Sequence, residues 1–436
     1  MTFEFKNLGA IKEAQIEMGR LTVISGKNNT GKTYLTYAVW GLSAGGFYTI
    51  NASDTFKSIS DSEKLLLASE LDSGILKEVD LSPLENEFTS RYLSSVLRYE
   101  EQINLLFGTS NTFFKNTKIT CAYNDIKEEI SRRIYGERDD NNAYIFKYEN
   151  IEGTLIFKLQ IQKMKDKTFD VYELEKCLGS IGYHVFYHNP YLFTAQREAI
   201  HLFKYSINKS ARYGLRNGIK NNQRDKYAIP LERNIDFVSD FDNLEQNYSF
   251  LKDTDLITEI EQILGIKYQI HYDSFQVENA NGITTPAFMA STSVRTLADL
   301  HFYLKHLAQK GDLLMIDEPE LNLHPENQIK IARLLVKLVN AGIRVWITTH
   351  SDYIVKELNN CLMLSNDFTD KEAFMQEYNY KENDILKKED IRVYIAHEEG
   401  TVEQVEIGKF GMKKTTFDEA LKRFNEVSDT LFNILD

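Results

Sequence analysis

The pattern of apolar and polar positions divides the first 45 residues into strands, a loop and a helix. Apolar and polar side chains alternate at positions 3–5 and again at 14–18, which is typical of half-buried β-strands. The continuous apolar run 21–24 predicts a buried strand, and a glycine-containing loop follows it. Apolar residues then recur at helical spacing over positions 33–42. The chain therefore opens with strands that lead through a loop into a helix.

The C-terminal part of the chain alternates helices and strands in the same style. Strands that are joined by helices run parallel, so these segments and the opening strands predict one α/β sheet with crossover helices. The predicted elements are bounded by turn residues such as Gly342. They are helices over 293–309 and 326–340, strands over 313–316 and 345–349, a hairpin over 391–407 and a terminal helix from Thr416.

The region from about residue 51 to 182 has a different pattern, and we interpret it as an insertion. It combines densely charged amphipathic helices with alternating segments that read as a hairpin. Helices of this kind are most often solvated scaffolding, so none of them is assigned a ligand. The predicted elements are helices over 61–79 and 90–107 and a hairpin over 142–149 and 153–162, and strand character returns over 184–191.

Length, charge and cysteine content exclude several classes of protein. A chain of 436 residues is too long for one ordinary core and suggests two or three lobes. A formal net charge of −13 argues against wrapping nucleic acid over most of the surface. Cys121, Cys177 and Cys361 are far apart, so we expect reduced thiols and neither disulfides nor a zinc site. Because the sequence shows neither a signal-peptide pattern nor a run of roughly 18 apolar residues, we expect a cytoplasmic protein with no membrane span.

One stretch, residues 201–226, is locally basic, with seven basic side chains against the single acid Asp225. It could follow a nucleic-acid backbone, with tyrosine rings available for stacking on bases. It could equally face an acidic subunit or form a solvated loop. The basic residues are Lys204, Lys209, Arg212, Arg216, Lys220, Arg224 and Lys226, and Tyr205 and Tyr213 lie between them.

The loop after the buried strand matches the phosphate-binding pattern GxxxxGK[ST] in full. Its glycines permit the turn, and its backbone N–H groups and the start of the following helix would face phosphates. The lysine would neutralise the outer phosphates of ATP, and the threonine hydroxyl would bind Mg²⁺. The matching residues are Gly26, Lys27, Asn28, Asn29, Thr30, Gly31, Lys32 and Thr33.

Asp317 and Glu318 follow the predicted strand 313–316, at the end where ligands of parallel sheets bind. Asp317 would hold Mg²⁺, and Glu318 would orient or deprotonate the attacking water. His350, at the end of the next predicted strand, could reach a γ-phosphate. The alternatives are solvated acids and a histidine that hydrogen-bonds to the backbone, but the phosphate loop upstream favours the catalytic interpretation.

These motifs resemble the ABC-type ATPase heads of the RecF, SMC and OLD group. The resemblance covers about residues 1–42 and 288–359. It implies an α/β P-loop NTPase fold with a mixed β-sheet flanked by helices, plus an α/β insertion lobe. The motifs that carry it are the phosphate loop, the acidic strand LLMIDEPE, the D-loop-like LNLHP and the switch-like TTHS. The domains it implies are 1–50 (first part of the head), 51–182 (mostly helical insertion), 183–286 (return segment with the basic stretch) and 287–436 (second part of the head).

In that group two heads enclose ATP, and the partner's signature motif completes each site. The matching position here holds residues 290–295, where Ser291 and Ser293 precede a helix and could meet a phosphate. Serine at a helix start is also an ordinary N-cap, and the glycine of the motif is absent. Gln196 and Arg197 lie roughly where OLD-like heads carry a Q-loop glutamine and an arginine motif. By this resemblance Gln196 could link Mg²⁺ to the insertion lobe, and Arg197 could bind phosphate or the neighbouring subunit. The two residues could equally begin a surface helix.

Three functions compete. In the first, the protein resembles the stand-alone ATPases of the anti-phage systems Septu and PARIS. Those ATPases oligomerise and control a separate effector, and here we expect that effector to be a nuclease. This first function is favoured because the 86 residues after His350 (436 minus 350) contain no acidic cluster of the Toprim type. The second is a RecF-like ATPase that binds DNA. The third, the ATPase subunit of a transporter, ranks last because the sequence has no LSGGQ string.

Overall fold

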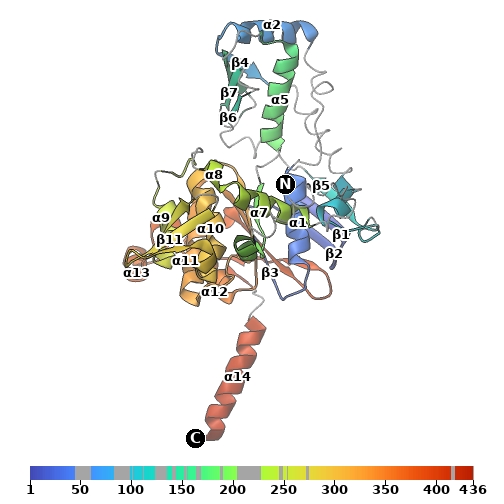
Figure 1. Ribbon diagram of the computed structural model, residues 1–436. Coiled ribbons are helices and arrows are strands. Elements are labelled where there is room, and N and C mark those ends of the chain that lie inside the picture. The colour runs from blue at the N-terminus through green and yellow to red at the C-terminus, as the bar shows by residue number, and fades with distance from the viewer. Residues whose placement is uncertain are drawn as a thin grey trace, which may run out of the picture. The chain divides into compact units, whose positions relative to one another are not determined.

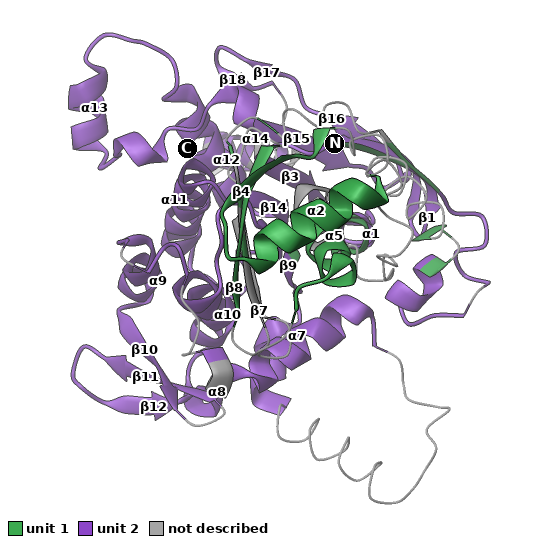
Figure 2. Ribbon diagram, turned by 90° about the horizontal axis from the view of Figure 1, so that it is seen from above, with its two compact units in different colours: residues 1–4, 39–102, 119–190 green, residues 5–38, 103–118, 191–436 purple. Residues whose placement is uncertain are grey.

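Figure 1 presents the computed structural model of the chain, in which two compact units can be distinguished. Unit 1 comprises residues 1–4, 39–102 and 119–190, and unit 2 comprises residues 5–38, 103–118 and 191–436 (Figure 2). The structure describes residues 1–44, 60–82, 99–100, 102–110, 112–122, 135–139, 144–151, 154, 156–163, 168–186, 190–203, 227–244, 249–252, 254–271, 274–413 and 418–435. The basic stretch from Lys204 to Lys226 therefore lies outside the described residues.

A mixed sheet forms the centre of unit 2. Its described strands follow the order β16-β15-β3-β14-β13-β9, in which β14 lies between β3 and β13 and is parallel to both. Strand β15 is also parallel to β3, whereas β16 is antiparallel to β15. The bounds are β3 (Leu21–Gly26), β9 (Pro190–Phe193), β13 (Leu313–Asp317), β14 (Arg344–Thr349), β15 (Ile391–Ala396) and β16 (Val402–Gln404). The predicted α/β fold with a mixed sheet flanked by helices is confirmed.

The central strands are apolar on both faces because helices cover both sides of the sheet. All residues of β3 and β13 are buried. The register pairs Asp317 with Thr348 and Thr349 with Ser25, so the three strands end at the same edge. The residues that follow each of these strands are therefore brought together at one edge of the sheet.

Helices of unit 2 begin and end at the residues that their sequences favour. Helix α11 starts with Pro325 in its first turn and ends at Gly342, which adopts φ 103°. Ser291 is the N-cap of α10. The helices are α1 (Lys32–Ala44), α7 (Ile229–Ser239), α8 (Phe241–Leu244), α9 (Leu256–Leu264), α10 (Thr292–His306), α11 (Pro325–Ala341), α12 (Asp352–Met363), α13 (Lys371–Glu377) and α14 (Asp418–Leu435).

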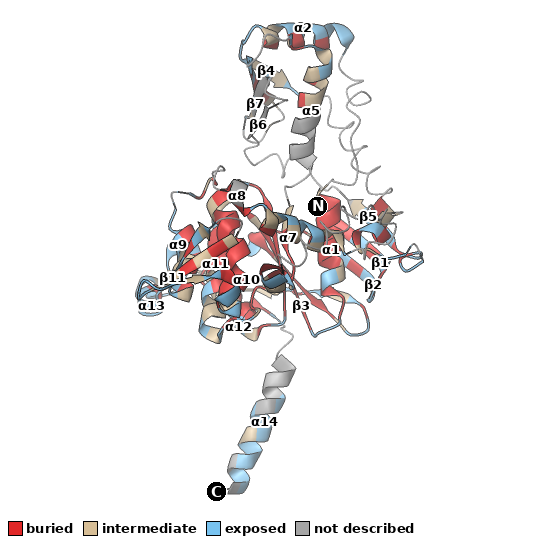
Figure 3. Ribbon diagram, in the orientation of Figure 1, coloured by how far each residue is buried: buried red, intermediate tan, exposed pale blue. Residues whose placement is uncertain are grey.

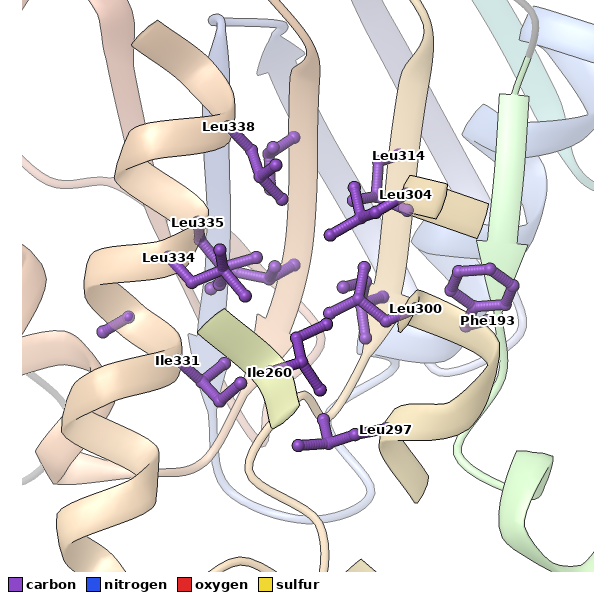
Figure 4. Close-up of a cluster of buried hydrophobic side chains, with 14 of the residues drawn as sticks. Phe193, Ile260, Leu297, Leu300, Leu304, Leu314, Ile331, Leu334, Leu335 and Leu338 are labelled. Carbon is purple, nitrogen blue, oxygen red and sulfur yellow. The ribbon is translucent and has the colours of Figure 1, made fainter. Parts of the chain in front are cut away.

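The main core lies where α9, α10 and α11 pack against the sheet. Figure 3 shows buried residues concentrated in the central strands and on the inner sides of these helices. The close-up in Figure 4 labels side chains from all of these elements, namely Phe193, Ile260, Leu297, Leu300, Leu304, Leu314, Ile331, Leu334, Leu335 and Leu338. This packing fixes α10 and α11 relative to the strands that carry the predicted site.

Smaller sheets complete the described structure. Strands β2-β1-β5 form one, β10-β11-β12 an antiparallel second, and β17-β18 a third. Their bounds are β1 (Thr2–Leu8), β2 (Ile11–Glu17), β5 (Lys118–Ala122), β10 (Ile266–His271), β11 (Ser274–Asn279), β12 (Thr284–Pro286), β17 (Ile407–Gly408) and β18 (Gly411–Met412). Cys121, Cys177 and Cys361, all within the described residues, form no disulfide. Among the described helices, none combines the length and the apolar character needed to cross a membrane.

Unit 1 contains helices and an antiparallel sheet. The described strands follow the order β4-β8-β7-β6, and the pair β7 and β8 confirms the predicted hairpin. Helix α2 begins at a capping box formed by Ser60 and Glu63. The bounds are α2 (Asp61–Asp72), α5 (Val171–Phe186), β4 (Lys77–Asp80), β6 (Tyr135–Asp139), β7 (Tyr144–Asn150) and β8 (Ile156–Lys163).

Two element predictions in unit 1 were wrong. The helix predicted over 61–79 ends at Asp72 because Gly74 adopts a left-handed φ of 78°, and the next residues form β4. The strand predicted from residue 184 begins only at Pro190, because apolar residues at 174, 178, 181 and 185 keep helical spacing and α5 runs to Phe186. Most of the helix predicted over 90–107 lies outside the described residues.

Replacing Ile331 tests the core between α11 and the sheet. Ile331 is fully buried, so Ile331→Ala should lower the free energy of unfolding by about 2–5 kcal/mol through lost contacts and a cavity. The matched control is Ile283→Ala, since Ile283 is 58% exposed, and its effect should stay within about 0.5 kcal/mol. Urea denaturation of both variants measures the difference. Equal effects would contradict the packing described here.

Candidate functional site

The loop between β3 and α1 needs glycine at two positions. A Cβ on Gly26 would lie 2.5 Å from the carbonyl oxygen of Ala396, and one on Gly31 would lie 2.7 Å from Cδ1 of Ile11. Gly31 also adopts φ 90°, a conformation that other residues avoid. The loop thus reaches the start of α1 through a path that only glycine fits, and the free N–H groups of that helix start suit an anion.

Lys32 lies at the start of α1 and is 6% exposed. Its Nζ donates to the carbonyl oxygens of Gly26 at 2.8 Å and Lys27 at 2.7 Å, so the side chain curls back along the loop. Burial lowers the pKa of Lys32, while the carboxylates of Glu318 and Asp317 act in the opposite direction. The loop lysine and the acidic strand end are therefore close enough for their charges to interact.

Asp317 receives hydrogen bonds from two hydroxyls. The Thr33 hydroxyl donates to Oδ2 at 3.0 Å, and the Thr348 hydroxyl donates to Oδ1. Burial raises the pKa of Asp317, and both hydrogen bonds counteract this shift. A hydroxyl from the phosphate loop next to a carboxylate is a pair of oxygen ligands of the kind that Mg²⁺ prefers. The residues present therefore fit the predicted metal.

Glu318 and His350 form an ion pair at the same edge of the sheet. Oε1 of Glu318 lies 3.4 Å from Nδ1 of His350, and the two side chains are 24% and 41% exposed. The hydrogen bond between them is the main cause of a raised pKa for His350 and a lowered pKa for Glu318. Each group thus favours the charged form of the other, and both side chains remain partly exposed.

Glu320 belongs to this cluster, although sequence analysis gave it no role. It is 5% exposed, and its Oε1 accepts hydrogen bonds from the Thr349 hydroxyl and the His350 N–H, both at 2.8 Å. The same oxygen lies 3.6 Å from Nδ1 of His350. Burial raises the pKa of Glu320. Glu320 therefore fixes the backbone that carries His350, and the one available signal was the third acid in the segment DEPE.

Arg197 does not meet the expectation of a phosphate ligand. It is 2% exposed, and its guanidinium donates to the carbonyl oxygens of Asp317 at 2.7 Å and Glu318 at 2.9 Å. Burial lowers the pKa of Arg197, with Asp299 the largest influence in the opposite direction. Gln196, by contrast, is exposed. The guanidinium faces the backbone of the acidic strand end.

Ser291 and Ser293 lie at the start of α10, and the N-cap interpretation of Ser291 is confirmed. Its Oγ accepts from the N–H of Val294 at 3.4 Å and lies 3.0 Å from Oγ of Ser293. Ser291 is exposed, so a second molecule could reach it. A contact of these serines with phosphate stays a prediction.

In the phosphate loop, the Thr30 hydroxyl donates to the carbonyl of Lys27, and the Lys27 ammonium lies 3.4 Å from Glu398.

A model of the AAA ATPase domain matches residues 1–355. The chain belongs to this family. The match contains both the phosphate loop and the acidic strand end, so the predicted P-loop ATPase fold is confirmed, and the family implies nucleotide binding.

The solved structures that the chain matches include SMC heads. An SMC head domain from Thermotoga maritima matches with 10% identity and a TM-score of 0.31, over 93% of this chain and 98% of that chain. A Smc head with an extended coiled coil, bound to the C-terminal domain of ScpA from Pyrococcus furiosus, matches with 12% identity and a TM-score of 0.35, over 98% of each chain. Scores of this size support no inference about function. A comparison with curated proteins finds no match.

The pair of His350 and Glu318 should make stability depend on pH. A histidine whose pKa is raised by folding stabilises the protein fully below its ordinary value of 6.5, and the effect is lost as pH rises through the folded pKa. A glutamate whose pKa is lowered stabilises above its ordinary value of 4.5 and loses the effect as pH falls through the folded pKa. His350→Gln should therefore destabilise the protein most between pH 4.5 and pH 6.5, the ordinary pKa values of the two groups.

Urea denaturation of the wild type and of His350→Gln, without nucleotide or metal, measures this dependence. The difference in midpoint should shrink as pH rises above the folded pKa of His350. A difference that is constant with pH would show that the two side chains do not interact as charges.

Proposed function

We propose that this member of the AAA ATPase domain family binds ATP with Mg²⁺ and hydrolyses it. The observation that carries the proposal is the hydrogen bond between Thr33, in the phosphate loop, and Asp317, at the acidic strand end. This contact and the nearby Lys32 place in one site the groups that would bind a nucleoside triphosphate and its metal ion.

Each residue of the site has a definite task in this proposal. The loop from Gly26 to Thr33 binds the phosphates through backbone N–H groups, and Lys32 exchanges its two carbonyl partners for phosphate oxygens. Thr33 and Asp317 would hold Mg²⁺. When bound, the metal neutralises charge that develops on the phosphate oxygens.

Glu318 is the proposed general base. Its carboxylate is charged, because its pKa lies below the ordinary value, and it is partly exposed at the end of β13. From there it would orient the attacking water and accept its proton. His350 would hold Glu318 in place in the resting state and bind the γ-phosphate when ATP is present. Glu320 keeps the His350 backbone fixed during this exchange.

Two copies of the chain would complete each other's sites. Ser291 is exposed at the N-terminus of α10, where the helix dipole and free N–H groups favour an anion. We therefore infer that Ser291 and Ser293 of one copy contact ATP bound to another, in a homodimer of heads or a larger homo-oligomer.

The motif resemblance supports a cytoplasmic role in anti-phage defence, in which the ATPase controls a separate effector protein, a nuclease. A RecF-like ATPase that binds DNA is the second candidate, because the stretch from Lys204 to Lys226 is basic in an otherwise acidic chain. A transporter subunit is the least supported of the three.

Two substitutions separate binding from hydrolysis. Lys32→Ala should abolish measurable binding of a fluorescent ATP analogue, because it removes the ammonium that faces the phosphates. Glu318→Gln should keep binding, lower the turnover rate at least about 100-fold and trap an ATP-bound dimer. Lys267→Ala, at an exposed lysine on β10, is the control and should change neither quantity. Normal ATP hydrolysis by Glu318→Gln would refute the role given to that residue.

The two candidate roles differ in their response to DNA. The RecF-like role predicts that DNA stimulates ATP hydrolysis and binds less tightly as salt rises. Replacing Arg212, Arg216 and Lys220 with Gln should then reduce the slope of log affinity against log salt by about 0.7–0.9 per lost phosphate contact. The effector role predicts no stimulation by DNA alone. Turnover rates and binding isotherms over a salt series distinguish the two.

A further inference from the structure

The backbone of Glu318 is in an unusual conformation. Its φ is 54°, in the left-handed region that residues other than Gly, Asn and Asp seldom adopt. Such a conformation persists only where surrounding contacts hold it. On the amide side, the Glu318 N–H donates to the carbonyl oxygen of Thr348 at 3.1 Å and lies 3.3 Å from the Thr348 hydroxyl. The contacts on the carbonyl side come from a different element.

That element is the segment that begins at Thr194. Nη1 of Arg197 donates to the carbonyl oxygen of Asp317 at 2.7 Å, and Nη2 donates to the carbonyl oxygen of Glu318 at 2.9 Å. One guanidinium thus binds two consecutive carbonyls, immediately before and after the turn into the left-handed conformation. Because buried carbonyls need donors, the bonds fix the direction in which the chain leaves β13.

The opposite side of Arg197 is anchored to the start of α10. Nε donates to the carbonyl oxygen of Thr296 at 3.0 Å, and Nη1 also donates to the carbonyl of Thr194 at 3.0 Å. The neighbouring Glu198 forms an ion pair with Arg295 at 2.6 Å. Arg197 cannot turn away without breaking these bonds, so its position relative to Asp317 and Glu318 is fixed.

We propose that Arg197 is a positioning residue for ATP hydrolysis, which holds the carbonyls of Asp317 and Glu318 so that the Glu318 carboxylate stays at the site. The proposal rests on the general-base role given above to Glu318. Arg197 touches neither substrate nor metal in this account. It acts through the backbone of the residue that does the chemistry.

Arginine is required here for a geometric reason. Its planar fork presents donors at fixed separation to the two carbonyls on one side and, through Nε, to α10 on the other. A lysine ammonium has three donors around a single point, so it cannot span all of these acceptors. Arg197→Lys keeps the positive charge and most of the side-chain volume. It removes only the planar guanidinium group with its fixed hydrogen-bond donors.

The first test is the kinetics of Arg197→Lys. The turnover rate per nucleotide-binding site should fall about 10- to 100-fold, as expected when a catalytic group is displaced by a small distance, while nucleotide affinity changes less than about 3-fold. Arg333→Lys is the matched control. Arg333 is a largely buried arginine in α11 that pairs with Glu357 at 2.6 Å, away from the site. Its replacement should leave the turnover rate unchanged.

The second test is a double-mutant cycle with Glu318→Gln, measured in single turnovers. If Arg197 acts through Glu318, adding Arg197→Lys to Glu318→Gln should slow the reaction no further. A purely structural role would instead lower the folded fraction or nucleotide affinity, and these are measured in parallel. If Arg197→Lys does not yield folded protein, Arg197→Gln provides the same comparison, since its amide can still bind one carbonyl.

The outcomes separate this inference from the proposed function. A normal turnover rate in Arg197→Lys, a loss of rate matched by an equal loss of affinity, or independent losses in the double variant would each overturn the positioning role. If Glu318→Gln itself hydrolyses ATP normally, the assignment of the general base fails first. If Glu318→Gln is inactive and Arg197→Lys is not impaired, only the inference about Arg197 fails.

Discussion

The hydrogen bond from the Thr33 hydroxyl to the Asp317 carboxylate joins two segments that are 284 positions apart in the sequence. It can form only because β14 lies between β3 and β13 and pairs with both in parallel. This register brings the carboxyl ends of the three strands to one edge. The phosphate loop, the acidic strand end and His350 therefore converge through the topology of the sheet.

Charge at this edge is balanced by a small number of contacts. Asp317, Glu318 and Glu320 lie close together, and burial raises the pKa of Asp317 and Glu320. Among the nearby cations, His350 has its pKa raised mainly by its hydrogen bond with Glu318, whereas burial lowers the pKa of Lys32 and the acids counteract that shift. A cluster of buried carboxylates is stable only with nearby cations or hydrogen-bond donors. In the proposed function, Mg²⁺ would add positive charge beside Asp317, and the triphosphate would pair with the Lys32 ammonium.

The sequence was sufficient for the parts of the site that depend on local patterns. The phosphate loop, the strand that ends at Asp317 and the strand before His350 could be predicted because each combines an apolar run with a defined chemical group at its end. Gly342 correctly marked the end of α11. These features need no knowledge of which segments are neighbours.

The contacts of Arg197 and Glu320 could not be predicted in this way. Their partners are mostly backbone atoms of other elements, and backbone carbonyls leave no trace in the sequence. The end of α5 was missed for a different reason. Its last turn, with Val185 and Phe186, is rich in residues that favour strands, but the helical spacing of apolar residues along the whole segment outweighed that local preference.

A crystal structure of the protein with Mg²⁺ and a non-hydrolysable ATP analogue tests the central claim most directly. The account predicts that the triphosphate lies along the loop from Gly26 to Thr33, with Lys32 at the outer phosphates and the metal between Thr33 and Asp317. An analogue bound elsewhere, or a metal that contacts neither Thr33 nor Asp317, would contradict it.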